Sequence, residues 1–122
     1  MSSMYIDRVI DHYKNPRNKK VLKIYTAEFE DENILCGDRI KFQVLIEHNK
    51  IVDIGFTGSG CILSIASASI LSEYARGKSI HEILSLSDDR FINIIGVKPG
   101  KSRINCLLLP LRVLKKAIKQ LA

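Results

Sequence analysis

Hydrophobic positions near the start of the chain follow a helical period. Between residues 4 and 13 the apolar side chains share one helix face: Ile6, Val9, Ile10 and Tyr13. The residue before a proline disfavours helical conformation, so Pro16 ends this helix near Asn15. The pattern therefore predicts an N-terminal helix that is followed by a turn.

Three segments after this helix alternate apolar and polar residues, which is typical of half-buried strands. The first segment begins near Lys23, the second spans residues 38–47 and the third spans residues 51–57. The short stretch from His48 to Lys50 favours a hairpin between the last two strands. We therefore expect an antiparallel sheet with one covered face.

The rest of the chain is typical of helices. A helical period covers residues 61–76, and Gly77 is suited to end that helix. Ser79 and Ser87 each precede a short apolar segment and are expected to cap a helix there. Ser102 is expected to cap the C-terminal helix in the same way.

These elements predict an α+β fold in one domain over residues 1–122. It has a small three-stranded antiparallel sheet with helices packed on one face, an N-terminal helix and a C-terminal helix bundle. Pro110 lies inside the last helix and has no N–H group to bond the carbonyl of Cys106. We therefore expect the helix to kink or restart at Pro110.

Composition limits the functions that the chain can have. Its 122 residues are 46% hydrophobic and 26% charged, which excludes a disordered chain. No apolar run reaches the roughly 18 residues of a membrane span. The first residues also lack the apolar segment of a secretory signal. We expect a cytoplasmic protein without a membrane partner.

The charge balance is basic, since 19 lysines and arginines outnumber 13 acidic residues and give a net charge of +6. Such a surface suits an acidic partner, and nucleic acid is one candidate. Aromatic residues are only 7% of the chain and tryptophan is absent, so no platform for stacking bases is evident. Solvated helix faces explain the charges better, and we expect no nucleic-acid partner.

Each of the three cysteines has a distinct setting. Cys36 and Asp38 flank a glycine at the turn between two strands, while Cys61 begins a helix and Cys106 lies about one turn inside another. Unpaired N–H groups at a helix N-terminus favour the thiolate form, which applies to Cys61 and Cys106. The odd number and wide spacing do not indicate a disulfide framework.

Three thiolates and one carboxylate are a ligand set for zinc or for an iron–sulfur centre. The oxygen of Asp38 binds more weakly than sulfur, which suits a site that releases its cargo. The spacing leaves a metal site and three buried structural cysteines as open alternatives.

Other polar residues have weaker claims to a function. Three histidines lie away from the cysteine motifs and are expected to be exposed or capping: His12, His48 and His81. Three serines lack a nearby base and are expected to allow close helix packing: Ser64, Ser67 and Ser69. Tyr5 is either a functional contact or an apolar anchor.

Four stretches of the chain match a known family. They are residues 5–18, the Cys36-Gly37-Asp38 motif, residues 60–78 with Cys61 and the Ser64–Ser69 stretch, and residues 103–106 with Cys106. Through them the chain resembles the IscU/NifU-type scaffolds for iron–sulfur cluster assembly over essentially its whole length. The resemblance implies that Cys36, Asp38, Cys61 and Cys106 surround one cluster site. It also implies that a cysteine desulfurase supplies the sulfur.

Some features of the sequence resemble one branch of this family, and others resemble a second branch. Asn105 stands where the IscU branch has a histidine, and residues 99–103 replace the LPPVK segment that binds its chaperone. Arg103 and the serine-rich stretch look like the SufU branch, which includes zinc-binding sulfur-transfer proteins. The short interval between Cys61 and Cys106 is similar to the IscU branch. The sequence is thus a hybrid of the two.

The resemblance favours a non-enzymatic scaffold that assembles a labile [2Fe–2S] cluster and passes it to recipient apoproteins or carrier proteins. Cys106 is the candidate persulfide acceptor, and Arg103 and Asn105 are adjacent to the cluster. Arg103 would stabilise negative charge on sulfur. The protein is expected to be a monomer or a cluster-bridged homo-oligomer.

Two other functions stay open. In the first, zinc binds to the same four residues and the protein is a zinc-dependent sulfurtransferase that accepts persulfide sulfur. The loss of the histidine at position 105 and the presence of Arg103 favour it. In the second, the chain is a basic interaction module that would keep its binding without its cysteines.

Overall fold

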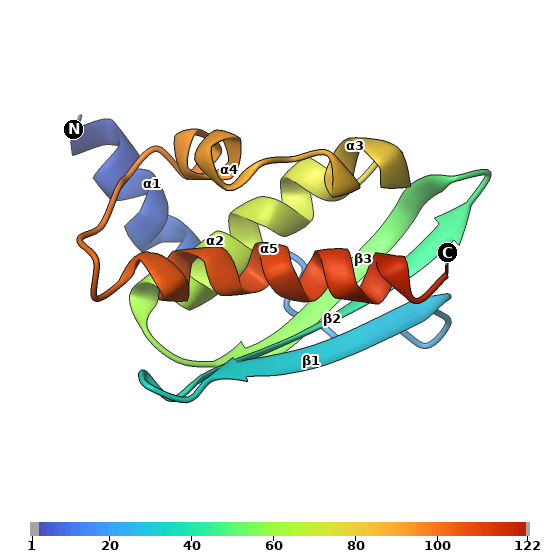
Figure 1. Cartoon of the computed structure of the whole chain (residues 1–122), viewed down its shortest axis with the longest axis horizontal. Helices are drawn as coiled ribbons and strands as arrows, with labels where there is room; N and C mark the ends of the chain where they lie inside the picture. Colours follow the sequence, from blue (N-terminus) through green and yellow to red (C-terminus); the bar gives the residue numbers. More distant parts are fainter. Residues whose placement is uncertain (1–2, 122) are drawn as a thin grey trace.

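A three-stranded sheet lies against a layer of helices in the part of the chain that the computed structural model describes, residues 3–121 (Figure 1). The elements follow in the order α1 (Ser3–Lys14), β1 (Ala27–Asn33), β2 (Asp38–Glu47), β3 (Lys50–Ser59), α2 (Ile62–Ala75), α3 (Ile80–Leu84), α4 (Asp88–Ile95) and α5 (Ile104–Lys119). The predicted α+β class and three-stranded sheet are confirmed. None of the helices within residues 3–121 has the length and apolar character needed to cross a bilayer.

The sheet has the order β1-β2-β3, and both neighbouring pairs are antiparallel. His48 and Asn49 form the turn between β2 and β3, with φ angles of 52° and 64°. Positive φ at both central residues is what a tight two-residue hairpin requires, so this hairpin is confirmed. At the other end of β2, Asn33 pairs with Asp38 and leaves residues 34–37 as the loop between β1 and β2.

The first strand begins at Ala27 rather than near Lys23. The chain before it first contacts β3, where the backbone N–H of Phe56 donates to the carbonyl of Asn18 at 2.9 Å, and then reaches the face of β2 that carries Gln43. There the backbone N–H of Leu22 donates to the side-chain oxygen of Gln43 at 2.8 Å. This bond satisfies a buried amide on a face that the alternation predicts to be solvated.

The core lies between the helices and the inner face of the sheet. Alternate residues of β2 and β3 are fully or almost fully buried there: Ile40, Phe42, Val44, Ile54 and Phe56. The rings of Phe42 and Phe56 pack with their centroids 5.8 Å apart. α5 lies across β1 and β2, and α2 lies over β3 and beside α5. Burial of this apolar surface is the main force that holds the helices on the sheet.

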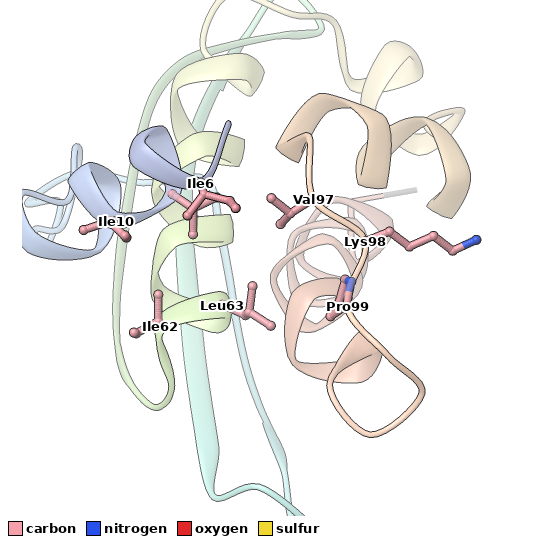
Figure 2. A pocket seen from close by; sticks show the side chains of 8 residues that line it. Ile6, Ile10, Ile62, Leu63, Val97, Lys98 and Pro99 are labelled. Carbon is pink, nitrogen blue, oxygen red and sulfur yellow. The ribbon is translucent and has the colours of Figure 1, made fainter. Parts of the chain in front are cut away.

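α1 contacts α2 through a different face from the one that its periodicity predicts. Val9 and His12 are buried, whereas Ile6, Ile10 and Tyr13 are between 39% and 44% exposed. The exposed isoleucines line a groove of about 250 Å³ between α1, the start of α2 and the loop before α5 (Figure 2). The other apolar residues of the groove are Val9, Ile62, Leu63, Val97 and Pro99.

The expectation that His12 is exposed is wrong. Only 4% of the residue is accessible, and its Nδ1 lies 2.7 Å from the hydroxyl of Ser69 on α2. That hydroxyl also accepts the backbone N–H of Arg17 at 2.8 Å. The imidazole Nε2 lies 3.5 Å from the carboxylate of Glu73. A neutral ring satisfies this arrangement, with Nδ1 accepting from Ser69 and Nε2–H directed at Glu73.

The caps of the two short helices are confirmed. The hydroxyl of Ser79 accepts the backbone N–H of Glu82 at 3.1 Å, and that of Ser87 accepts the N–H of Arg90 at 3.2 Å. Each bond satisfies one of the N–H groups that the first turn of a helix leaves unpaired.

The predicted cap of the last helix is wrong, because Arg103 and not Ser102 is the N-cap of α5, without a side-chain bond. The carbonyl of Gly100 accepts from the N–H groups of Arg103 and Ile104 at 3.0 and 3.1 Å. A backbone turn therefore replaces the side-chain cap. α5 continues through Pro110 as one helix, so it does not restart there, and a kink of the helix axis at this residue stays a prediction.

We expect the protein to lose stability as the pH falls below about 6.5, the ordinary pKa of histidine. Burial, followed by the charge of Arg17, lowers the pKa of His12 in the folded protein. The unfolded chain therefore binds a proton at a pH where folded His12 is still neutral, and stability rises with pH across that window. Urea unfolding at pH 8 and pH 5.5 measures the difference. A His12→Asn variant, which keeps a polar group near Ser69, is expected to show a smaller difference, and an unchanged one would contradict this role of His12.

Candidate metal centre

Three segments that are far apart in the sequence meet at one end of the sheet. The β1–β2 loop carries Cys36, β2 begins with Asp38, and Cys61 and Cys106 lie at the starts of α2 and α5. Figure 1 shows these three segments at the same end of the molecule. The Sγ atoms of Cys36 and Cys106 and a carboxylate oxygen of Asp38 lie within 4.8 Å of one another.

Cys61 lies at the side of this group. It lines the same cavity of about 290 Å³ as Cys36 and Cys106, together with Ser102 and Arg103. Its backbone N–H donates to Oδ1 of Asp38 at 2.9 Å. The three cysteines thus line one cavity, and Asp38 lies within 4.8 Å of two of their sulfur atoms, those of Cys36 and Cys106.

The two further candidates are placed differently. Arg103 is exposed and lines the cavity of the cysteines. Asn105 is exposed and lines a separate cavity between α5 and the β1–β2 loop, where its side-chain oxygen accepts from Arg112 at 3.4 Å. Proximity in the sequence to Cys106 therefore does not place Asn105 at the cysteines.

Two glycines give the backbone its path around Asp38. Gly37 has a φ of +74° and Gly60 has a φ of +152°, which side chains rarely adopt. A Cβ atom at Gly60 would lie 2.4 Å from Oδ1 of Asp38, so only glycine lets the end of β3 approach this carboxylate. The close approach is what allows Cys61 to donate to it.

The carboxylate of Asp38 is the most unusual polar group of the site. The residue is fully buried, and its second oxygen, Oδ2, has no hydrogen-bond partner among the described residues. An unpaired buried carboxylate oxygen is costly unless a cation or a donor binds to it. Its position beside two sulfur atoms fits a metal ion better than it fits a purely structural role.

The prediction that the helix N-terminus favours the thiolate of Cys106 is wrong for the metal-free protein. Burial raises the pKa of the Cys106 thiol far above its ordinary value, and the neighbouring side chains of Asp38 and Cys36 raise it further. Desolvation of the charged form outweighs the helix dipole here. A bound cation reverses this balance, because a coordinating thiol loses its proton to the metal.

Two side chains at the cysteines were not predicted. The hydroxyl of Ser64 lies 3.4 Å from Sγ of Cys61, and the side-chain amide of Asn33 donates to Sγ of Cys106 at 3.9 Å. Ser64 stands three residues after Cys61 in a helix, and this spacing places both on one face. From the sequence, Asn33 could be placed at the site only through its pairing with Asp38. That pairing can be predicted only when the length of the β1–β2 loop is known.

Three sulfur atoms and one oxygen favour particular metals. Thiolates select zinc and iron–sulfur centres, whereas calcium and magnesium need sites rich in oxygen. Four donors are also the number that zinc prefers in its tetrahedral sites. The donor set of this cavity therefore fits zinc or iron with sulfide.

Comparisons with known proteins agree with this chemistry. The family model of the NifU-like N terminal domain matches residues 4–122. An iron–sulfur cluster assembly scaffold protein, IscU 1 of Archaeoglobus fulgidus, is 35% identical over 115 residues, which cover 94% of this chain and 74% of the relative. The zinc-dependent sulfurtransferase SufU of Bacillus subtilis is 33% identical over 135 residues, which cover 97% of this chain and 91% of that protein.

A solved structure has the same fold. The crystal structure of a putative iron–sulfur cluster assembly scaffold protein for the SUF system from Fervidobacterium islandicum superposes with a TM-score of 0.82 at 27% identity. The match covers 97% of this chain and 99% of that one. The arrangement of helices on one face of the sheet is therefore shared along the whole chain.

We expect the three cysteines of the metal-free protein to react with iodoacetamide in the order Cys36, Cys61, Cys106. Cys36 is exposed, Cys61 is intermediate, and Cys106 is 1% exposed with a raised thiol pKa. Only the accessible thiolate attacks the reagent. Mass spectrometry of peptides from a time course measures the order, and the same reaction in urea should remove the differences. Faster labelling of Cys106 than of Cys36 in the folded protein would contradict the prediction.

Proposed function

Since the chain belongs to the family of NifU-like N terminal domains, we propose that it is a scaffold for the assembly of an iron–sulfur cluster that is then passed to recipient proteins. The observation that carries the proposal is that Cys36, Cys61 and Cys106 line one cavity, while the carboxylate of Asp38 lies within 4.8 Å of two of their sulfur atoms. The cluster is the cargo of such a protein and not a resident group.

We propose that these four residues hold a [2Fe–2S] cluster. Such a cluster has four terminal positions, two on each iron, and is usually held by four thiolates. Here Asp38 would take the fourth position with the oxygen that has no other partner. An oxygen ligand binds iron of a cluster more weakly than a thiolate does, and this would favour release of the cargo.

We propose that sulfur enters at Cys36. A desulfurase carries it as a persulfide, and the Cys36 thiolate would attack the outer sulfur of that persulfide. One sulfur–sulfur bond forms and another breaks, and the thiolate of the desulfurase leaves, so no electrons are added or removed. The exposure of Cys36 and the burial of Cys106 support this order over a first transfer to Cys106.

Arg103 is proposed to stabilise the negative charge that accumulates in the cavity. It lines the cavity from the N-cap of α5, beside Ser102 and opposite the β1–β2 loop. A guanidinium is always protonated and donates several hydrogen bonds, so it suits both a persulfide and an anionic cluster.

A zinc-dependent sulfurtransferase is the second candidate. The presence of Arg103 at the cysteines favours it, as does the similarity to a SufU protein. The same four residues would hold the zinc ion, which when bound keeps its cysteine ligands deprotonated. An exposed Cys36 could then accept sulfur and pass it on without any cluster.

Anaerobic reconstitution with ferrous iron, cysteine, a cysteine desulfurase and dithiothreitol, which reduces persulfide sulfur to sulfide, separates the two functions. We expect visible absorption of a [2Fe–2S] cluster with two irons and two sulfides per cluster, and loss of this absorption in Cys36→Ser, Cys61→Ser and Cys106→Ser variants. A protein that forms no cluster but accelerates the desulfurase in a zinc-dependent manner would overturn the scaffold proposal. Full iron and sulfide content in Cys61→Ser would remove this residue from the ligand set.

We expect an Asp38→Ala variant to keep its cluster longer and to transfer it more slowly than the parent protein. The substitution removes the weak oxygen ligand and the buried carboxylate beside the sulfur atoms. Decay of cluster absorption and transfer to an apo-ferredoxin measure the two rates. Glu47→Ala, at the other end of β2 and exposed, is the matched control and should behave as the parent. Faster loss of the cluster from Asp38→Ala would show that the carboxylate retains the cargo.

A further inference from the structure

Asn33 is the last residue of β1, directly opposite Asp38 in the ladder. Residues that are paired across an antiparallel ladder have their side chains on the same face of the sheet. This is the face that α5 covers, since Lys116 of α5 contacts the ring of Phe29 and the carboxylate of Asp31 in alternate positions of β1. The alternation therefore directs Asn33 towards α5, as it does Asp38.

The main chain and the side chain of Asn33 have separate contacts. Its carbonyl accepts the backbone N–H groups of Cys36 and Gly37 at 3.2 and 2.8 Å, which closes the β1–β2 loop. Its side-chain amide donates to Sγ of Cys106 at 3.9 Å. A change of the side chain can thus remove the contact with sulfur while it leaves the backbone bonds of the loop available.

We propose that Asn33 is a positioning residue for Cys106. The side-chain amide of Asn33 stabilises the sulfur atom of Cys106 when this sulfur binds a metal. The inference rests on the proposed role of Cys106 as a ligand. A metal-bound thiolate carries negative charge, and its near neighbours Cys36, Cys61 and Asp38 add more. The side-chain amide of asparagine supplies a hydrogen-bond donor without itself replacing a thiolate as ligand.

A hydrogen bond to a ligating sulfur has two measurable effects. It holds the ligand in the orientation that binds the metal, and removal of such an outer contact costs about 10- to 100-fold in metal affinity. It also withdraws electron density from the sulfur, which changes the electronic properties of thiolate sites. Transfer of charge from sulfur to metal then needs more energy, so loss of the bond moves this absorption to longer wavelength.

Titration of the purified protein with Co²⁺ under anaerobic conditions tests both effects. Asn33→Leu keeps a similar volume without a donor, and Asn33→Ala removes the donor without added bulk. Both variants are expected to bind Co²⁺ about 10-fold or more weakly than the parent. Both should also show the sulfur-to-cobalt absorption at longer wavelength. Asn93→Leu is the matched control, because Asn93 is exposed on α4, and it should leave both readouts unchanged.

The outcomes separate this inference from the proposed function. An absence of sulfur-to-cobalt absorption in the parent protein would overturn the metal site and the role of Asn33 with it. A parent absorption that stays at the same wavelength and affinity in both Asn33 variants would overturn the role of Asn33 alone. A shift of the absorption in Asn33→Leu but not in Asn33→Ala would reflect the added bulk of leucine and would also overturn the role of Asn33. Circular dichroism of each variant verifies that the fold is retained.

Discussion

The hydrogen bond between the carboxylate of Asp38 and the backbone N–H of Cys61 joins the sheet to the helical layer at the site. At 2.9 Å it connects the first residue of β2 to the N-cap of α2, and Gly60 is needed for the approach. Asp38 lies just after the β1–β2 loop, so the bond lies beside the cavity that Cys36 and Cys61 line. α5 then completes the site with Cys106 when it packs on β1, β2 and α2.

The bond satisfies only one oxygen of a buried carboxylate. The other oxygen has no partner among the described residues, and an unsatisfied buried group of this kind costs about 1–3 kcal/mol or more. The thiol of Cys106 is also kept protonated by burial in the metal-free protein. The carboxylate of Asp38 and the thiol of Cys106 are therefore both unfavourable in the metal-free protein, and a bound cation would stabilise both. Binding of a metal at the proposed site would therefore stabilise the fold.

The sequence predicts most elements but not how they contact one another. Periodicity identifies the strands, and the serine caps at Ser79 and Ser87 follow from local chemistry. The buried face of α1 does not follow, because a helix with several apolar positions has more than one apolar stripe. The hydroxyl of Ser69 on α2 decides that His12 is inside. A backbone turn at Gly100 likewise replaces the expected cap at Ser102, and no residue type reveals such a turn.

The candidate site could also be predicted only in part from the sequence. Soft thiolates beside a carboxylate indicate metal chemistry from residue types alone, whereas solvent access and hydrogen-bond partners depend on tertiary packing. Asn105 is next to Cys106 in the sequence and lines another cavity, while Asn33, which is distant in the sequence and lines that same cavity, donates to the sulfur of Cys106.

The three cysteines differ in their exposure to solvent, so the site is open on one side and covered on the other. Cys36 is on an exposed loop, Cys61 is partly covered, and Cys106 is a buried residue of α5. In the proposed function a sulfur donor would approach from the side of the loop, where Ile34 and Leu35 precede Cys36 and are 84% and 92% exposed. An exposed apolar pair of this kind suits contact with another protein. The buried thiol of Cys106 and carboxylate of Asp38 lie behind it, where negative charge would be stabilised mainly by a bound metal and by nearby hydrogen-bond donors. Cargo bound there is shielded from one side and can be reached from the other, as a protein that both receives and delivers requires.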